Sequence, residues 1–183
     1  KLGFMGMTVP KKYGGSGIDK MCYMIALEEI SRVCGSTGLT VEAHNSLGVG
    51  HIYEKGTEEQ RKKYLPQLLH GEALAAWALT EPNAGSDAAS LQTTAVLEKD
   101  EWVINGTKQF ITSGDIAAVT TVMAKTDKSL GAKGISAFIV EKDTPGITIG
   151  VLEDKLGLRG SRTAELIFED CRIPAENLIG KDG

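Results

Sequence analysis

The sequence has 183 residues, of which 42% are hydrophobic, and it carries a formal net charge of −4 at pH 7. This length is enough for one domain, or two small ones, with a substantial core. Basic residues gather only in short runs such as Lys11-Lys12 and Lys62-Lys63, the latter preceded by Arg61, so neither nucleic acid nor an anionic membrane is an expected partner. No apolar run is long enough to span a bilayer.

The three cysteines are Cys22, Cys34 and Cys171, and they form no Cys-x-x-Cys pair. Their number is odd, so free thiols in a reducing compartment are the simplest interpretation. The chain begins at Lys1 rather than at a methionine and ends just after a strand-like segment. We therefore expect it to be a piece of a longer polypeptide.

The first seventy residues are predicted to be helical, after a glycine-rich connecting turn over residues 1–18. Asp19 is suited to cap a helix that runs to Val33, because apolar residues follow it at helical spacing. Met21 and Met24 belong to this apolar set, and we expect them to fill the core.

Two further helices are expected before the character of the sequence changes. The first covers residues 36–55, and Gly48 and Gly50 within it permit close packing at a cost in helix propensity. Residues 57–60, Thr-Glu-Glu-Gln, have the pattern of a capping box that opens a short helix. Pro66 is expected to kink or end that helix.

After residue 71 the sequence consists of short β-type runs separated by turn residues. The runs cover residues 74–80, 93–98, 102–105, 108–112, 119–124, 135–141 and 164–168. Asn105-Gly106 predicts a tight hairpin turn, because type I′ turns need positive φ at both central residues. Short strands at regular spacing favour an antiparallel barrel or sandwich. We therefore expect an α+β chain, with a helical domain over residues 1–72 and a β-barrel or sandwich domain over residues 73–183.

Two segments combine hydroxyl groups with an aromatic ring and small residues. Residues 77–87 read Trp-Ala-Leu-Thr-Glu-Pro-Asn-Ala-Gly-Ser-Asp, and residues 110–114 read Phe-Ile-Thr-Ser-Gly. Small side chains let a ligand approach the backbone, and hydroxyls both donate and accept hydrogen bonds. Each segment alone is a weak signal, because many strands simply end in a polar turn.

Together the segments are more specific. Thr-Glu-Pro-x-x-Gly-Ser-Asp, followed by Trp-x-x-Asn-Gly-x-Lys-x-x-Ile-Thr, closely resembles the acyl-CoA dehydrogenase family of flavoproteins, nearest to its short-chain (butyryl-CoA) branch. The resemblance runs from residues 13–17 to residues 173–178. It implies the first two of the family's three domains, FAD as cofactor, an acyl-CoA substrate and a homotetramer. It also implies electron transfer to an electron-transfer flavoprotein, in bacterial cytoplasm or the mitochondrial matrix.

The resemblance carries eight flavin contacts onto this sequence. They are Trp77, Leu79, Thr80, Gly85, Ser86, Phe110, Ile111 and Thr112. It implies that Thr80 binds the pyrimidine end of the flavin, that Phe110 covers one ring face and that Thr112 lies near N5. Ser86 is also expected to touch the CoA side of the substrate. Phe110 stands where many relatives carry Trp, so altered spectra rather than lost binding are expected.

The implied reaction is α,β-desaturation of an acyl-CoA thioester. The family's catalytic base is a glutamate of the third domain, outside this chain, so we nominate no catalytic residue. Glu81 lies in the flavin motif, but a turn or surface carboxylate is the better interpretation. His44 and His51 are seven residues apart without a third ligand, so structural or exposed histidines are expected rather than a metal site. Residues 41–47 resemble the part of the family near the acyl tail, although ordinary helix packing is the preferred interpretation.

Two other functions fit the same sequence. An acyl-CoA oxidase would catalyse the same half-reaction, but its reduced flavin would react with oxygen. A binding module on the same scaffold would keep the fold without turnover. Butyryl, isobutyryl, 2-methylbutyryl and isovaleryl thioesters are all compatible with the resemblance.

Overall fold

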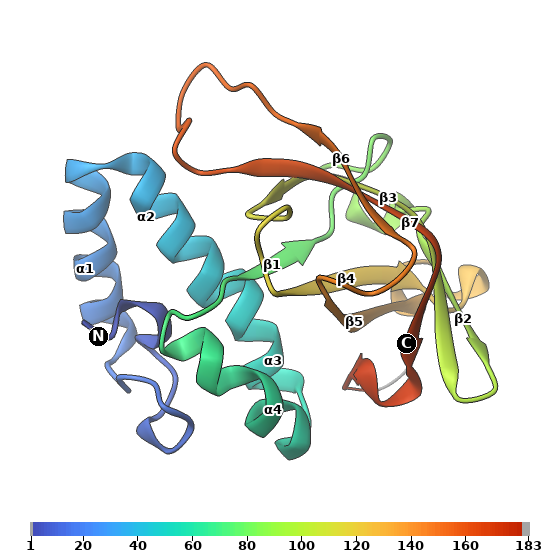
Figure 1. Ribbon diagram of the computed structural model, residues 1–183, viewed down its shortest axis with the longest axis horizontal. Helices are drawn as coiled ribbons and strands as arrows, with labels where there is room; N and C mark the ends of the chain where they lie inside the picture. Colours follow the sequence, from blue (N-terminus) through green and yellow to red (C-terminus); the bar gives the residue numbers. More distant parts are fainter. Residues whose placement is uncertain (1, 181–183) are drawn as a thin grey trace.

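The computed structural model describes residues 2–180, which form a helical half and a strand-rich half (Figure 1). The predicted α+β class is therefore confirmed. The last α-helix ends at Leu69 and the first strand begins at Ala75, while the domain boundary at residue 72 stays a prediction. Within residues 2–180, no helix is both long enough and apolar enough to cross a membrane.

The helical half contains four α-helices and one π-helical stretch. They are α1 (Lys20–Val33), α2 (Gly35–Glu42), the π-helical η3 (Ala43–Val49), α3 (Gly50–Lys55) and α4 (Glu58–Leu69). Asp19 caps α1 as predicted, accepting hydrogen bonds from the backbone N–H groups of Met21 and Cys22. Thr57 and Gln60 form the predicted capping box of α4.

Two expectations about these helices need correction. Pro66 does not end α4, because buried leucines such as Leu65 and Leu68 hold the last turn against the core, while the alternative of a kink stays a prediction. Met21 and Met24 do not fill the core, since their exposed fractions are 70% and 56%. Apolar residues occur around more of α1 than its packed face, so helical spacing alone did not identify the buried side.

The segment expected as one helix over residues 36–55 is helical throughout, but its centre winds as the π-helix η3. Asn45 in η3 donates to the Phe4 carbonyl at 2.8 Å and accepts from the Met7 N–H at 3.1 Å, which ties the chain start to the helices. A Cβ atom on Gly48 would lie 2.5 Å from the Cβ of Ala75. The predicted close packing at Gly48 is therefore confirmed, and it brings η3 against the first strand. The same expectation for Gly50 is wrong, because a Cβ atom there would meet only the Asn45 carbonyl, at 3.6 Å.

The strand-rich half is one eight-stranded sheet. The strands are β1 (Ala75–Ala78), β2 (Thr94–Glu98), β3 (Glu101–Thr112), β4 (Val119–Lys125), β5 (Ile135–Glu141), β6 (Ile147–Leu152), β7 (Thr163–Pro174) and β8 (Leu178–Ile179). Their order is β6-β7-β3-β2-β4-β5-β8, with β1 paired to β4. The sheet is mixed rather than wholly antiparallel as predicted, because β1 arrives from the helices and lies parallel to β4.

The sheet folds over on itself around an apolar interior. Trp102 on β3 and Phe138 on β5 are separated by two strands in the sheet order, yet their ring centroids are 5.1 Å apart. A second cluster joins the halves, where Leu65 and Leu68 of α4 pack with Val119 and Ile139 of the sheet. In Figure 1, β1 lies between the helices and the rest of the sheet, and the β6–β7 connection reaches toward α1 and α2.

The predicted hairpin turn at Asn105-Gly106 is wrong, because β3 runs unbroken through it from Glu101 to Thr112. Gly106 has φ of 149° at an irregularity in the pairing of β3 with β7. Asn105 accepts a hydrogen bond from the backbone N–H of Asp170 on β7. The turn between β2 and β3 lies instead at Lys99, whose φ is 58°. A strand irregularity can need the same unusual backbone angles as a turn, so the dipeptide alone could not separate the two.

The contact between η3 and β1 yields a stability prediction. In Gly48→Ala the new methyl group would lie within 2.7 Å of Ala75 backbone atoms, so we expect a loss of about 1–3 kcal/mol in the free energy of unfolding. Gly50→Ala is the matched control, because its nearest neighbour would be the Asn45 carbonyl at 3.6 Å. That control should unfold at the same or slightly higher denaturant concentration. Equal stability of the two variants would contradict the close packing.

Candidate functional site

Six of the eight predicted flavin residues line one cavity of about 180 Å³. They are Trp77, Leu79, Thr80, Phe110, Ile111 and Thr112, and Ala76 of β1 lies among them. Ala43 and Leu47 of η3 complete the lining. The two sequence motifs thus meet at one place, because the chain leaving β1 runs beside β3 and the Gln109 N–H donates to the Thr80 carbonyl at 2.8 Å.

Phe110 is turned toward the cavity by an irregularity in β3. The register of β3 against β7 shifts between Lys108 and Ile111, and Phe110 adopts φ of 60°. Residues two apart on a regular strand share one face, but Lys108 is fully buried whereas Phe110 is 55% exposed. The bulge therefore re-aims the aromatic ring, which is a common use of bulges near binding sites.

The cavity wall offers polar atoms that nothing else in the described chain uses. The hydroxyl groups of Thr80 and Thr112 make no hydrogen bond within residues 2–180, and the buried indole N–H of Trp77 has no partner there. The Trp77 ring stacks on His51 of α3, with centroids 5.2 Å apart and planes at 22°. The wall therefore combines flat apolar surfaces with unpaired hydrogen-bonding groups.

Gly85 and Ser86 lie outside this cavity, on an exposed loop that follows Glu81. A Cβ atom on Gly85 would meet nothing within 4 Å, and Gly85 has no left-handed backbone angle. The packing of this chain therefore gives no reason for glycine at this position. The roles of both residues in ligand binding stay predictions.

Glu81 is not the turn or surface carboxylate that the sequence suggested. It pairs with Lys108 at 2.7 Å, and the two side chains are 4% and 0% exposed. Glu81 also accepts hydrogen bonds from the backbone N–H groups of Thr93 at 2.9 Å and Gln92 at 2.5 Å, while Lys108 donates to the Leu79 carbonyl at 3.1 Å. The interpretation failed because the partner lies 27 residues away in the sequence.

The ionisation of the pair follows from its surroundings. Burial by itself raises the pKa of Glu81, but the donors Lys108, Thr93 and Gln92 outweigh it and hold the pKa below its ordinary value. Burial lowers the pKa of Lys108, and the attraction of Glu81 opposes this shift. We therefore treat the pair as ionised, and Glu81 as a structural carboxylate rather than a free base.

Removing one charge of this pair is expected to be costly. Lys108→Met keeps an unbranched apolar chain but leaves Glu81 buried and unpaired, so we expect a loss of about 3–5 kcal/mol in unfolding free energy. Arg172→Met is the matched control, because its ion pair with Glu98 is exposed and should contribute less than about 1 kcal/mol. Urea denaturation of both variants measures the difference. A Lys108→Met variant as stable as the control would contradict the burial argument.

His44 is structural, as the sequence suggested. Its Nδ1 atom accepts from the Ala75 N–H at 3.0 Å, and its Nε2 atom donates to the carbonyls of Met5 and Leu68, each at 3.1 Å. This network requires the neutral ring, with its proton on Nε2. Burial lowers the pKa of His44, although the Leu68 and Met5 carbonyls oppose the shift.

This histidine predicts a pH dependence of stability. The unfolded chain takes up a proton near the ordinary pKa of 6.5, whereas the folded chain resists protonation. Stability should therefore fall as pH drops below 6.5, by up to about 1.4 kcal/mol per pH unit until the folded pKa is passed. His44→Asn retains an acceptor for the Ala75 N–H and should flatten the profile between pH 6.5 and 5. His70→Asn, at an exposed histidine, is the matched control; an unaltered profile in His44→Asn would contradict the assignment.

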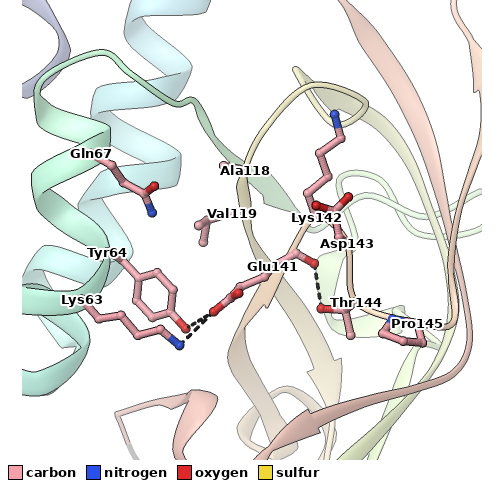
Figure 2. Close-up of a pocket in the computed structure, with 10 residues that line it drawn as sticks. All are labelled: Lys63, Tyr64, Gln67, Ala118, Val119, Glu141, Lys142, Asp143, Thr144 and Pro145. Carbon is pink, nitrogen blue, oxygen red and sulfur yellow. Dashed lines mark hydrogen bonds and ion pairs between the residues drawn. The ribbon is translucent and has the colours of Figure 1, made fainter.

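A larger cavity, of about 530 Å³, lies between α4 and the segment that follows β5 (Figure 2). At its floor Glu141 accepts from the Tyr64 hydroxyl and pairs with Lys63, both at 2.9 Å. Hydrogen bonding from Lys63 is the main reason that the pKa of Glu141 is lowered. This cavity contains none of the predicted site residues, and its charged residues Lys63 and Glu141 pair with each other. We therefore interpret it as part of the contact between helices and sheet.

Within residues 2–180 no group of three or more His, Cys, Asp or Glu side chains is arranged to hold a metal ion. The three cysteines are free, with Cys22 and Cys34 exposed and Cys171 buried. Burial raises the pKa of the Cys171 thiol to about 11.

Two family models match the chain. The model described as "Acyl-CoA dehydrogenase, N-terminal domain" matches residues 1–72, and "Acyl-CoA dehydrogenase, middle domain" matches residues 76–171. The chain belongs to the acyl-CoA dehydrogenase family. The predicted resemblance is thereby confirmed, and the cavity lies where the matched segments of this acyl-CoA dehydrogenase chain meet.

Individual relatives and solved structures are also similar to this chain. "Acyl-CoA dehydrogenase, short-chain specific" of Clostridium acetobutylicum is 54% identical over all of this chain and 48% of the relative. A chain in a solved structure described as "Electron transferring flavoprotein of Acidaminococcus fermentans" has 52% identity and a TM-score of 0.96 over 98% of this chain and 47% of its own. An acyl-CoA dehydrogenase of Bacillus anthracis complexed with FAD has 46% identity and a TM-score of 0.91, and the match covers 98% of this chain and 30% of that one. The chain spans about half the length of the curated relatives it matches.

Proposed function

We propose that this chain is the flavin-binding part of an FAD-dependent dehydrogenase that desaturates short-chain acyl-CoA thioesters between the α- and β-carbons. The observation that carries the proposal is the cavity that the two motifs build together, with Thr80 and Thr112 unpaired on its wall. The short-chain relative and the FAD complex of a second relative support the substrate class and the cofactor.

The residues of the cavity fit a flavin ring system. A flat heteroaromatic ring needs apolar surfaces on its faces and hydrogen-bonding groups at its edge. Phe110, Ile111 and Leu79 would supply the surfaces, while the hydroxyl groups of Thr80 and Thr112 would serve the edge. When bound, FAD supplies the acceptor for the hydride that leaves the β-carbon.

The threonine hydroxyls would orient the cofactor without adding charge. A hydroxyl can donate or accept, so it suits both the oxidised and the reduced ring. One neutral hydrogen bond contributes about 0.5–1.5 kcal/mol, so the apolar walls must supply much of the affinity. The same walls would keep water from the reacting carbons.

The proton acceptor is proposed to lie outside this chain. No residue lining the cavity carries a titratable side chain, and the nearby Glu81 is committed to Lys108. A carboxylate from a further domain would therefore take the α-proton, and the remaining electron pair would form the new double bond as the β-hydride departs. Ala43 and Leu47 border the same cavity and would limit the length of the acyl chain.

The proposed partner for reoxidation is an electron-transfer flavoprotein, and the proposed assembly is a homotetramer. The similarity to a chain solved in work on the electron transferring flavoprotein of A. fermentans supports the partner. Bacterial cytoplasm or the mitochondrial matrix stays the proposed location.

Anaerobic mixing of the full-length protein with butyryl-CoA tests the function. The visible flavin bands should bleach as the substrate is desaturated, because the hydride reduces the ring. Bound flavin that no saturated acyl-CoA bleaches would favour the binding module and contradict the proposal. Stoichiometric peroxide after each turnover in air would identify an oxidase instead.

A further inference from the structure

The two segments that carry the cavity residues are joined beneath the surface by the ion pair Glu81–Lys108. We propose, on the basis of the function above, that this pair positions the two flavin-facing segments relative to each other. Glu81 follows Leu79 and Thr80 directly, and Lys108 precedes Phe110 by two residues. The pair would act through these neighbours and would not touch the substrate or the cofactor.

Few hydrogen bonds from β3 fix the position of the first segment, residues 79–81. Strand β1 ends at Ala78, so Leu79 and Thr80 belong to no strand. Within residues 2–180, three hydrogen bonds cross from β3 to this stretch: Lys108 Nζ to the Leu79 carbonyl, Lys108 Nζ to Glu81 Oε1, and the Gln109 N–H to the Thr80 carbonyl. Two of the three belong to the lysine. The position of Leu79 and Thr80 over the cavity thus depends largely on this one side chain.

Glu81 holds further parts of the site. Its carboxylate binds the backbone N–H groups of Gln92 and Thr93, which lead into β2. Its own backbone N–H and carbonyl bond to those of Ala84 at 3.0 and 3.1 Å, so the loop with Gly85 starts from this anchor. A single carboxylate therefore connects the exit from β1, the glycine loop and the start of β2.

The second segment, which contains Phe110, also has to be held in place. Phe110 keeps a left-handed backbone angle that a non-glycine residue adopts at a cost, and such a conformation persists only where the surroundings determine it. Lys108 lies immediately before the bulge, fully buried and bonded at its tip. The side chain thus fixes the strand on one side of the bulge while Phe110 projects on the other.

Two apolar side chains could fill the space that Glu81 and Lys108 occupy, but they could not fix how the two segments are oriented relative to each other. Buried ion pairs are often no more stabilising than apolar residues of similar volume, whereas their hydrogen bonds specify geometry. If Glu81 and Lys108 position the two segments, replacing both residues should leave the stability of the fold nearly unchanged but weaken and alter the binding of the flavin. This distinction separates a positioning role from a purely structural one.

The test uses the full-length protein and the double variant Glu81→Gln/Lys108→Met. We expect apoprotein melting close to that of the wild type, but an FAD dissociation constant raised about tenfold or more. The absorption bands of the bound flavin should also lose their resolved shoulders, because the ring is held less rigidly. Glu81→Gln alone is the second variant, since it keeps the size of the side chain and one acceptor oxygen. Because Lys108 is then unpaired, this variant should melt at a lower temperature, so its flavin affinity and spectrum are compared with those of a control variant that is destabilised elsewhere.

Ile173→Ala is the control for general destabilisation, because Ile173 is buried in the sheet core and does not line the cavity. It should melt at a lower temperature yet keep the flavin spectrum and an affinity within about twofold of the wild type. Wild-type affinity and spectrum in the double variant would overturn the positioning role, as would an equal change in Ile173→Ala. A wild-type protein that binds no FAD would instead reject the proposed function itself.

Discussion

Two opposite charges are enclosed beneath the candidate site, and much of the local chain path is organised to satisfy them. Taking a carboxylate and an ammonium group out of water is unfavourable unless each finds partners. Glu81 and Lys108 pair with each other, and main-chain groups at Leu79, Gln92 and Thr93 form further hydrogen bonds with the two charged groups. Because these groups belong to three separate segments, satisfying the charges also sets where those segments lie.

The cavity is a product of both halves of the molecule. Strand β1 brings Trp77 to it, β3 brings Thr112, and the π-helical stretch η3 brings Leu47. The halves approach closely because Gly48 has no side chain to separate η3 from β1, and His44 binds the main chain of β1 directly. A wall whose lining side chains carry no titratable group suits the binding and orientation of a ring.

The residues that line the cavity were predicted better than the residues that hold them in place. The motif residues were expected near a ligand, and six of the eight flavin residues do share a cavity. Ala43 also lines that cavity, although ordinary helix packing was the preferred interpretation of its segment. Glu81 was misjudged because burial depends on what covers a residue, which the sequence does not state. One signal was available: Lys108 stands in the middle of a strand pattern, where a charge implies a buried partner.

The sequence by itself determined the local features, namely the caps at Asp19 and Thr57, the change from helix to strand after residue 71 and the family motifs. These depend on groups a few residues apart. Only the tertiary structure decided that Asn105-Gly106 lies within a strand, that β1 runs parallel to β4 and that Glu81 meets Lys108. Each of those outcomes is set by contacts between segments distant in the chain, whose energies exceed the local preferences of the residues involved.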